Sequence, residues 1–223
     1  VMVKIPDLVT KSKSSIHSIT TDFLEGFQTI SKNKGLRYLF LYAMAITFIM
    51  MPAAIMFPLL TTGHYAGGKW EMGVIEVVWG GGMLIGGAIL STFKLKGSKV
   101  VAVNVMYVLL GLTFILSGAL PASWFVGFVL TTAIGGISLS VFNGCFTAIV
   151  QTEVSPDKLG RVFSLYYSLA VLPSVIGLLF TGLIAEVIGV NITFIVSGCL
   201  AILVGILSFG TRNLMQLGKI KNV

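Results

Sequence analysis

The sequence predicts an all-α integral membrane protein, a bundle of six transmembrane helices preceded by an amphipathic helix. Only 10% of its 223 residues are charged, whereas a soluble domain of this size carries about 25%. Its mean hydropathy is +0.98, and 56% of its residues are hydrophobic. A surface with so few charges cannot be mostly in contact with water. Soluble enzymes, nucleic-acid-binding domains and disordered chains are therefore excluded.

Long stretches without charged residues define the helices. Arg37 and Lys69 are separated by 31 uncharged residues, and Lys99 and Glu153 by 53. A bilayer core about 30 Å thick requires roughly 20 helical residues, so the longer stretch holds two spans with a turn at 120–123. Continuous apolar runs favour helices over β-barrel strands. The predicted spans form a domain of residues 36–211 and are Leu36–Thr62, Glu71–Phe93, Ser98–Gly118, Ser123–Val150, Arg161–Val187 and Val190–Thr211.

Residues 1–35 lack the apolar run of a signal peptide. Their apolar residues recur at spacings of three and four, which predicts an amphipathic helix on the inner membrane surface. A flexible linker that is only partly helical is the alternative. The repeating apolar residues of this segment are Ile16, Ile19, Phe23, Phe27 and Ile30.

At the other end of the chain, residues 212–223 are predicted to form a cytoplasmic tail.

The distribution of basic residues predicts the orientation of the spans. An even number of spans puts both termini on one side, where 14 of the 15 Lys and Arg residues then fall; only Lys69 lies opposite. Because basic loops stay in the cytoplasm, we expect a multi-pass protein of the cytoplasmic (inner) membrane with both termini cytoplasmic. Topology and anionic lipid thus explain the net charge of +7, and nucleic acid is not an expected partner.

The first span combines prolines with a soft apolar surface. Pro52 and Pro58 interrupt its backbone hydrogen bonding, and broken helices of this kind often move in transporters. Tyr42 shares a face with Pro52, and Met51 belongs to a surface rich in Met and Phe that suits bulky hydrophobic ligands. We therefore expect Tyr42 and Met51 to line a substrate cavity and Pro52 to act as a hinge. Packing against lipid is the alternative for most of these residues.

Glu76 is the main functional candidate of the second span. It lies about a turn and a half from the outer end, and no other carboxylate enters a span so far. An ionisable group within a membrane is costly unless it faces a cavity or a partner. Because burial favours the neutral form, a carboxylate there can bind and release protons, or attract a cationic substrate. Alternatively, Glu76 reaches the outer interface beside Lys69 and Trp70 and only anchors the helix.

The fourth span carries the most polar face. Small and hydrogen-bonding residues on one face usually mean close helix packing, but they can equally line a water-filled cavity. Ser140, Asn143 and Thr147 are the candidates for cavity lining, and Asn143 is the strongest because its amide needs partners. The stripe comprises Thr132, Gly136, Ser140, Asn143 and Thr147, at spacings of three and four.

In the fifth span, Pro173 and Gly177 predict a bendable, closely packed helix and are hinge candidates. No metal site, cofactor or catalytic residue is predicted. Cys145 and Cys199 have no partner at ligand spacing, and no hydrolase signature is present. We therefore do not expect an enzyme.

Several stretches of the sequence carry a family resemblance. They are Asp-Phe-Leu-Glu-Gly-Phe at 22–27, Asn-Lys-Gly-Leu-Arg at 33–37, residues 151–164 with Gly160 and Arg161, residues 173–182 and residues 185–189. Together they resemble the major facilitator superfamily, in particular its macrolide-efflux-type drug exporters. The first two resemble the end of the central loop of that group, the third resembles its loop between the tenth and eleventh helices, and the last two resemble its eleventh helix. The resemblance extends over most of the chain.

The resemblance implies that the spans are helices seven to twelve of a twelve-helix fold. It implies that Leu36–Thr62 and Ser123–Val150 line a central cavity, and that Glu71–Phe93 and Arg161–Val187 contact a missing N-terminal half. It also implies alternating access with proton-coupled export. We therefore expect a secondary transporter that exports a hydrophobic or cationic small molecule. Its partners would be the N-terminal half (or a parallel second copy), lipid, the solute and protons. The alternative is a non-transporting membrane scaffold or assembly subunit that binds partners through glycine-rich faces.

Overall fold

The computed structural model describes residues 16–92, 97–171 and 187–217, with side chains from Phe23 onward. The regular secondary structure of these residues is entirely helical, with no β-strand. Residues 159–171 form one helix. The others are α1 (Ile16–Lys32), α2 (Lys34–Ile55), α3 (Phe57–Leu59), the π-helical turn η1 (Leu60–His64), α4 (Lys69–Thr92), α5 (Lys99–Ala119), α6 (Phe125–Glu153), α8 (Val190–Gly210) and α9 (Arg212–Met215).

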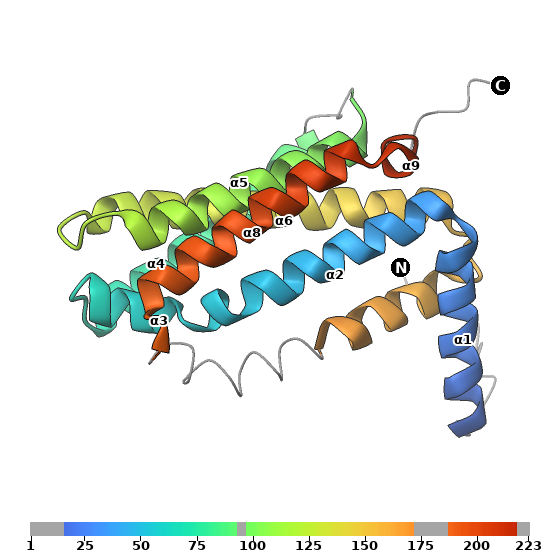
Figure 1. The fold of residues 1–223 in the computed structure, drawn as a ribbon, viewed down its shortest axis with the longest axis horizontal. Helices are drawn as coiled ribbons and strands as arrows, with labels where there is room; N and C mark the ends of the chain where they lie inside the picture. The colour runs from blue at the N-terminus through green and yellow to red at the C-terminus, as the bar shows by residue number, and fades with distance from the viewer. Residues whose placement is uncertain (1–15, 93–96, 172–186, 218–223) are drawn as a thin grey trace, which may run out of the picture.

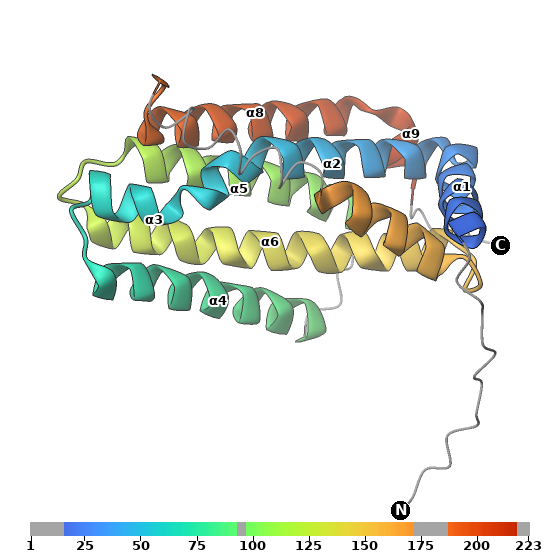
Figure 2. The same cartoon turned by 90° about the horizontal axis from the view of Figure 1, so that it is seen from below.

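Five of these helices, α2, α4, α5, α6 and α8, are long and apolar enough to cross a membrane. They lie roughly alongside one another, whereas α1 lies across one end of the bundle (Figures 1 and 2). The all-α membrane bundle predicted from the sequence is thus confirmed. The fifth predicted span, Arg161–Val187, falls partly outside the described residues. The predicted helix in residues 1–35 is present as α1.

The first predicted span is divided in the structure rather than continuous. α2 ends at Ile55, and Met56 leaves helical geometry with φ −87° and ψ 3°. The cause is Pro58, which has no N–H to bond the carbonyl four residues earlier and whose ring crowds that carbonyl. The chain therefore continues as the short α3 and the wider η1. Pro52, in contrast, lies inside α2 without ending it.

Glycine allows α5 and α8 to pack with their backbones in contact. A Cβ on Gly111 would lie 2.6 Å from the carbonyl oxygen of Gly198, and one on Gly118 would lie 2.5 Å from that of Asn191. Buried polar side chains reinforce this contact: the Ser208 hydroxyl donates to Asn104 Oδ1 at 2.5 Å. Small residues and interhelical hydrogen bonds are what hold helices together in lipid, where the hydrophobic effect is absent.

α4 joins the bundle along one narrow face. Gly82 and Gly86 lie against the backbone of α6, where a Cβ on Gly86 would be 2.7 Å from the Ile137 oxygen. Gly136 of α6 lies against the backbone of Trp79 in return. Six large apolar side chains of α4, among them Val77 and Leu84, are exposed. α4 therefore presents a broad apolar surface away from α6.

The C-terminal segment is packed rather than free as far as it is described. Leu214 and Leu217 are buried, and Gly35 at the start of α2 lies against Leu217. The predicted tail of residues 212–223 thus begins with the short helix α9 docked on α2. Its residues 218–223 lie outside the described part of the chain.

A histidine joins three segments at the end of the bundle opposite α1. His64 Nδ1 is 2.7 Å from the amide nitrogen of Asn191, and His64 Nε2 is 2.8 Å from the carbonyl oxygen of Leu120. Because the amide nitrogen can only donate, Nδ1 accepts and Nε2 carries the proton. The imidazole thereby connects η1 to the start of α8 and to the turn before α6.

We expect His64→Leu to destabilise the protein by about 1–3 kcal/mol, because the Asn191 amide and the Leu120 carbonyl lose their partner. Thermal unfolding of the purified protein in detergent measures the effect. Thr62→Val, at an exposed position of the same turn, is the control and should leave the melting temperature nearly unchanged. Equal melting temperatures for wild type and His64→Leu would show that this connection contributes nothing.

Candidate functional site

Glu76 lines a small cavity between the α3–η1 segment and α4. The cavity has a volume of about 130 Å³. Glu76 itself is exposed, two turns after the start of α4, and has no hydrogen-bond or ion-pair partner among the described residues. The carboxylate is therefore free to meet a ligand or a proton. The lining residues are Phe57, Pro58, Thr61, Met72, Gly73, Ile75 and Glu76.

An aromatic cluster supports this cavity from the bundle side. The ring of Phe57 lies 5.1 Å from that of Phe194 in α8 and 5.6 Å from that of Trp79 in α4, measured between centroids. It also contacts Phe114 of α5 and Phe128 of α6, at 5.7 and 5.9 Å. Aromatic pairs at these distances stabilise packing beyond the area they bury. The break before α3 thus places a packed aromatic cluster beside the Glu76 carboxylate.

This combination suits a cationic or protonatable group with apolar substituents. The carboxylate attracts positive charge, and the faces of aromatic rings attract cations as well. The neighbouring Glu71 is already engaged, because its Oε2 accepts the N–H of Gly68 at 2.7 Å and so caps the start of α4. The Glu71 carboxylate therefore already accepts a hydrogen bond, whereas the Glu76 carboxylate, five residues later, can bind a ligand.

The predicted cavity residues do not gather in one place. The Tyr42 hydroxyl is 2.7 Å from Thr211 Oγ1 and so connects α2 to the end of α8. Ser140 lies at the α4 contact, where its Cβ is 2.9 Å from the position that a Cβ on Gly86 would take. Asn143 is exposed on α6 and has no hydrogen-bond partner among the described residues, while Met51 and Thr147 are half-buried. The polar stripe of α6 thus divides into a packing part and the exposed Asn143.

The hinge candidates are only partly described. Pro52 is half-buried inside α2. Pro173 and Gly177 lie outside the described residues. Gly160 is exposed in the first turn of the helix 159–171, and apart from its own helix no described residue lies within 4 Å of where its Cβ would be.

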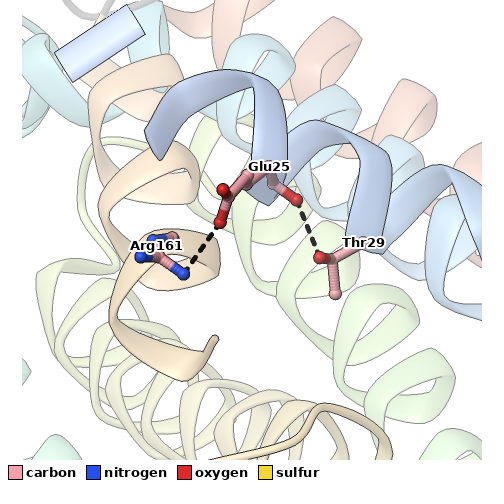
Figure 3. A network of polar contacts seen from close by, with 3 residues as sticks. All are labelled: Glu25, Thr29 and Arg161. Carbon is pink, nitrogen blue, oxygen red and sulfur yellow. Dashed lines mark hydrogen bonds and ion pairs between the residues drawn. The ribbon is translucent and has the colours of Figure 1, made fainter. Parts of the chain in front are cut away.

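Arg161, the other residue of the predicted loop motif, forms an ion pair with α1. Its guanidinium is 2.8 Å from the Glu25 carboxylate (Figure 3). Directly beside this pair, a Cβ on Gly26 would lie 3.0 Å from the Arg161 carbonyl oxygen, so the two backbones are in close contact. The Thr29 hydroxyl donates to the Glu25 carbonyl oxygen at 2.7 Å within α1.

A second contact joins the same segments further along the chain. Asn33 caps α2 by accepting the N–H groups of Gly35 and Leu36. Its amide nitrogen also donates to Glu153 Oε2 at the end of α6, at 3.1 Å. The turn between α6 and the helix 159–171 is therefore held on both sides by the α1–α2 segment. We call the contacts Glu25–Arg161 and Asn33–Glu153, together with Gly26, the clamp.

Within the clamped turn, a hydrogen bond with Ser155 lowers the pKa of Asp157, with Lys158 and Arg161 adding to the effect. Asp157 is therefore ionised at neutral pH. Because the pKa of Asp157 is lower in the folded chain than in the unfolded chain, the ionised carboxylate stabilises the folded turn. This stability is present above the unfolded pKa and is lost as the pH falls through the folded pKa.

Relatives with known names identify the family. The chain is 35% identical to macrolide efflux protein A of Streptococcus pyogenes over 205 residues, which is 92% of this chain and 51% of that protein. It is 33% identical to macrolide efflux protein A of Enterococcus faecalis, over 79% of this chain and 55% of that protein. The chain is therefore homologous to macrolide-efflux proteins over most of its own length.

A more distant member agrees with this assignment. The uncharacterized MFS-type transporter YfiS of Bacillus subtilis is 28% identical over 80% of this chain and 45% of its own length. The chain thus spans about half the length of the curated relatives it matches. No family profile matches the chain, and no solved structure matches it. The family resemblance predicted from the sequence is confirmed.

Three of the sequence stretches that carry the major facilitator resemblance meet at the clamp. Glu25, Gly26 and Asn33 belong to the stretches at 22–27 and 33–37, and their partners Glu153 and Arg161 belong to 151–164. Stretches separated by more than a hundred residues are therefore the two sides of one contact.

Reversing one charge of the clamp should destabilise the protein, and exchanging both should restore it. Glu25 and Arg161 are each about 40% exposed, at 44% and 38%, so water screens the pair and we expect at most about 1 kcal/mol for it. Glu25→Arg and Arg161→Glu should each lower the melting temperature in detergent, and the double variant should recover most of the loss. Glu25→Arg combined with Lys158→Glu, a charge change on the same turn, should not recover it. Additive single effects would contradict the pairing.

Proposed function

We propose that the chain is one half of a secondary active transporter that exports a hydrophobic or cationic small molecule in exchange for protons. The observation that carries this proposal is the similarity over 92% of the chain to a macrolide efflux protein about twice as long. The proposed mechanism is alternating access, in which two six-helix halves rock about a central site. Enzymatic chemistry has no part in it.

The membrane face of the structure supports this assignment. Asn143 exposes an amide in the middle of an apolar helix, where an unpaired polar group in lipid would be costly. We therefore place Asn143 at the central cavity or at the contact with the other half. The exposed apolar surface of α4 would pack against the other half or face lipid. Glu76 would bind the proton or the cationic group of the solute.

The direction of the helices supports the proposed orientation. α2 and α5 begin, and α6 and α8 end, at the end of the bundle where α1 lies (Figure 2). Lys34, Arg37, Lys99, Lys158 and Arg212 flank these helix ends, whereas Lys69 begins α4 at the opposite end. We assign the α1 end to the cytoplasm and the protein to the cytoplasmic membrane. The partner bundle is then the N-terminal half, or a second copy in parallel orientation.

A membrane scaffold is the alternative, and its main support is the abundance of glycine. In the structure, Gly82, Gly86 and Gly136 are used within the chain to join α4 to α6, and Gly111, Gly118 and Gly198 to join α5 to α8. These surfaces are therefore not available for binding other proteins. This internal use of glycine favours the transporter.

Flux through the full-length parent protein tests the proposal. The parent is reconstituted into liposomes, and the movement of ethidium and of a macrolide is followed with and without an imposed pH gradient. We expect flux that depends on the gradient and is lost when a protonophore collapses it. Protein-free liposomes are the control. Absence of flux for every amphiphile would favour the scaffold, and flux insensitive to the gradient would overturn proton coupling.

A further inference from the structure

The C-terminal half of helix α1 is attached to the bundle. The clamp holds Glu25, Gly26 and the residue that follows the helix, Asn33. Ile30 is buried against the bundle. From there α1 extends across the bundle end, roughly perpendicular to the transmembrane helices (Figure 1). Its 17 residues make a rod about 25 Å long at 1.5 Å per residue.

The apolar face of α1 is only partly covered. Phe23, Leu24 and Phe27 are 45%, 57% and 56% exposed, although they follow the same apolar periodicity as the buried Ile30. A cluster of two exposed phenylalanines and a leucine on one short helix marks an interaction surface. The occupant of this surface lies outside the chain as described.

The charge of α1 argues against an anionic membrane as that occupant. Its charged residues are Asp22, Glu25 and Lys32, which give the helix a net charge of −1. Helices that lie on membrane surfaces are instead rich in Lys and Arg on their polar face. The basic residues Lys34 and Arg37 belong to α2 and lie beyond the clamp. α1 therefore has the apolar face of an interfacial helix without its charge pattern.

We propose that Phe23, Leu24 and Phe27 dock on the cytoplasmic end of the other six-helix half. This inference rests on the proposed function, in which the chain preceding α1 leads to that half. A helix whose C-terminal part is clamped to one half, and whose N-terminal end continues toward the other, passes across the gap between the two. Its uncovered apolar face is then buried against the second bundle. α1 is thus a strut that joins the two halves on the cytoplasmic side.

A spin label on the strut distinguishes protein, lipid and water as its surroundings. In the full-length parent, with its other cysteines replaced, Phe27→Cys is labelled and the protein is placed in nanodiscs containing anionic lipid. Collisions with oxygen report lipid, and collisions with a water-soluble nickel complex report solvent. We expect the label at residue 27 to lose relaxation enhancement by both reagents. Lys32→Cys, at an exposed position on the side of α1 opposite Phe23, is the control and should respond to nickel.

A label accessible to oxygen alone would place α1 on the membrane, and one accessible to nickel would leave it in water; either result overturns the docking. A label at Leu24→Cys repeats the measurement on the same face if Phe27→Cys does not fold. Flux measured on the same preparations separates the two proposals. Gradient-dependent flux with an oxygen-accessible label refutes the strut alone, whereas a shielded label without flux supports the strut and refutes transport.

Discussion

Replacing Gly198 by leucine should prevent α5 and α8 from packing and destabilise the protein by about 3 kcal/mol or more. The new Cβ would overlap the carbonyl oxygen of Gly111 and lie 2.8 Å from the backbone nitrogen of Ile115. These are backbone atoms of a helix, so they cannot turn aside as a flexible side chain would. The helices must separate, which also breaks the buried hydrogen bond between Asn104 and Ser208. Overpacking a well-packed interior costs about 1–3 kcal/mol even where side chains can yield.

The neighbouring residue provides a matched control for this variant. Cys199 follows Gly198 directly but is exposed on α8. Cys199→Leu adds a larger side chain to the same helix without entering the contact, so we expect a change within about 0.5 kcal/mol. Thermal unfolding and size-exclusion chromatography in detergent compare the two variants. Equal stability of Gly198→Leu and Cys199→Leu would show that α5 and α8 are not in backbone contact.

The helices themselves could be predicted because a membrane imposes a strong and simple rule. Every apolar run without charge had to be a helix long enough to cross the bilayer, so α4, α5, α6 and α8 begin and end within a few residues of their predicted limits. The first span is the exception. There the position of Pro58 decided where the helix breaks, and the sequence alone does not say whether the chain bends or continues after a proline.

The helix contacts were harder to predict than the helices. Glycines in the second span indicated close packing, and the structure shows Gly82 and Gly86 against α6. The pairs Gly111–Gly118 and Gly198–Gly205 were missed although each has a spacing of seven residues. That spacing places both glycines of a pair on one helix face, a signal readable from the sequence. Which two helix faces meet depends on how the helices are arranged in the bundle, and no pattern in the sequence indicated that arrangement.

The same limit applies to the candidate site. Glu76 was identified because a carboxylate within a span is unusual. Its neighbours Phe57, Pro58 and Thr61 were not grouped with it, because they approach α4 only after the break at Met56 turns the chain. Likewise, the partners of His64 and Glu25 are more than fifty residues away along the chain. The sequence offered no pattern that links such distant residues.

Glu76→Gln should reduce proton-coupled flux by about tenfold or more, which corresponds to about 1.4 kcal/mol. The substitution keeps the shape of the side chain and its place beside Phe57 and Met72, so the cavity stays intact. It removes the negative charge and the ability to bind a proton. Flux of ethidium by the reconstituted parent should therefore become insensitive to an imposed pH gradient. A neutral solute should lose its dependence on the gradient in the same way.

Glu71→Gln is the matched control, because it makes the same chemical change five residues earlier on the same helix. Glu71 accepts the N–H of Gly68, and the amide oxygen of glutamine can accept it as well, so flux should remain and still depend on pH. If instead Glu76→Gln transports at the wild-type rate with its full pH dependence, Glu76 only anchors α4 at the outer interface. Among the described transmembrane helices, Glu76 is the only acidic residue that lies more than a turn from a helix end. Proton coupling would then have to depend on a residue outside these helices.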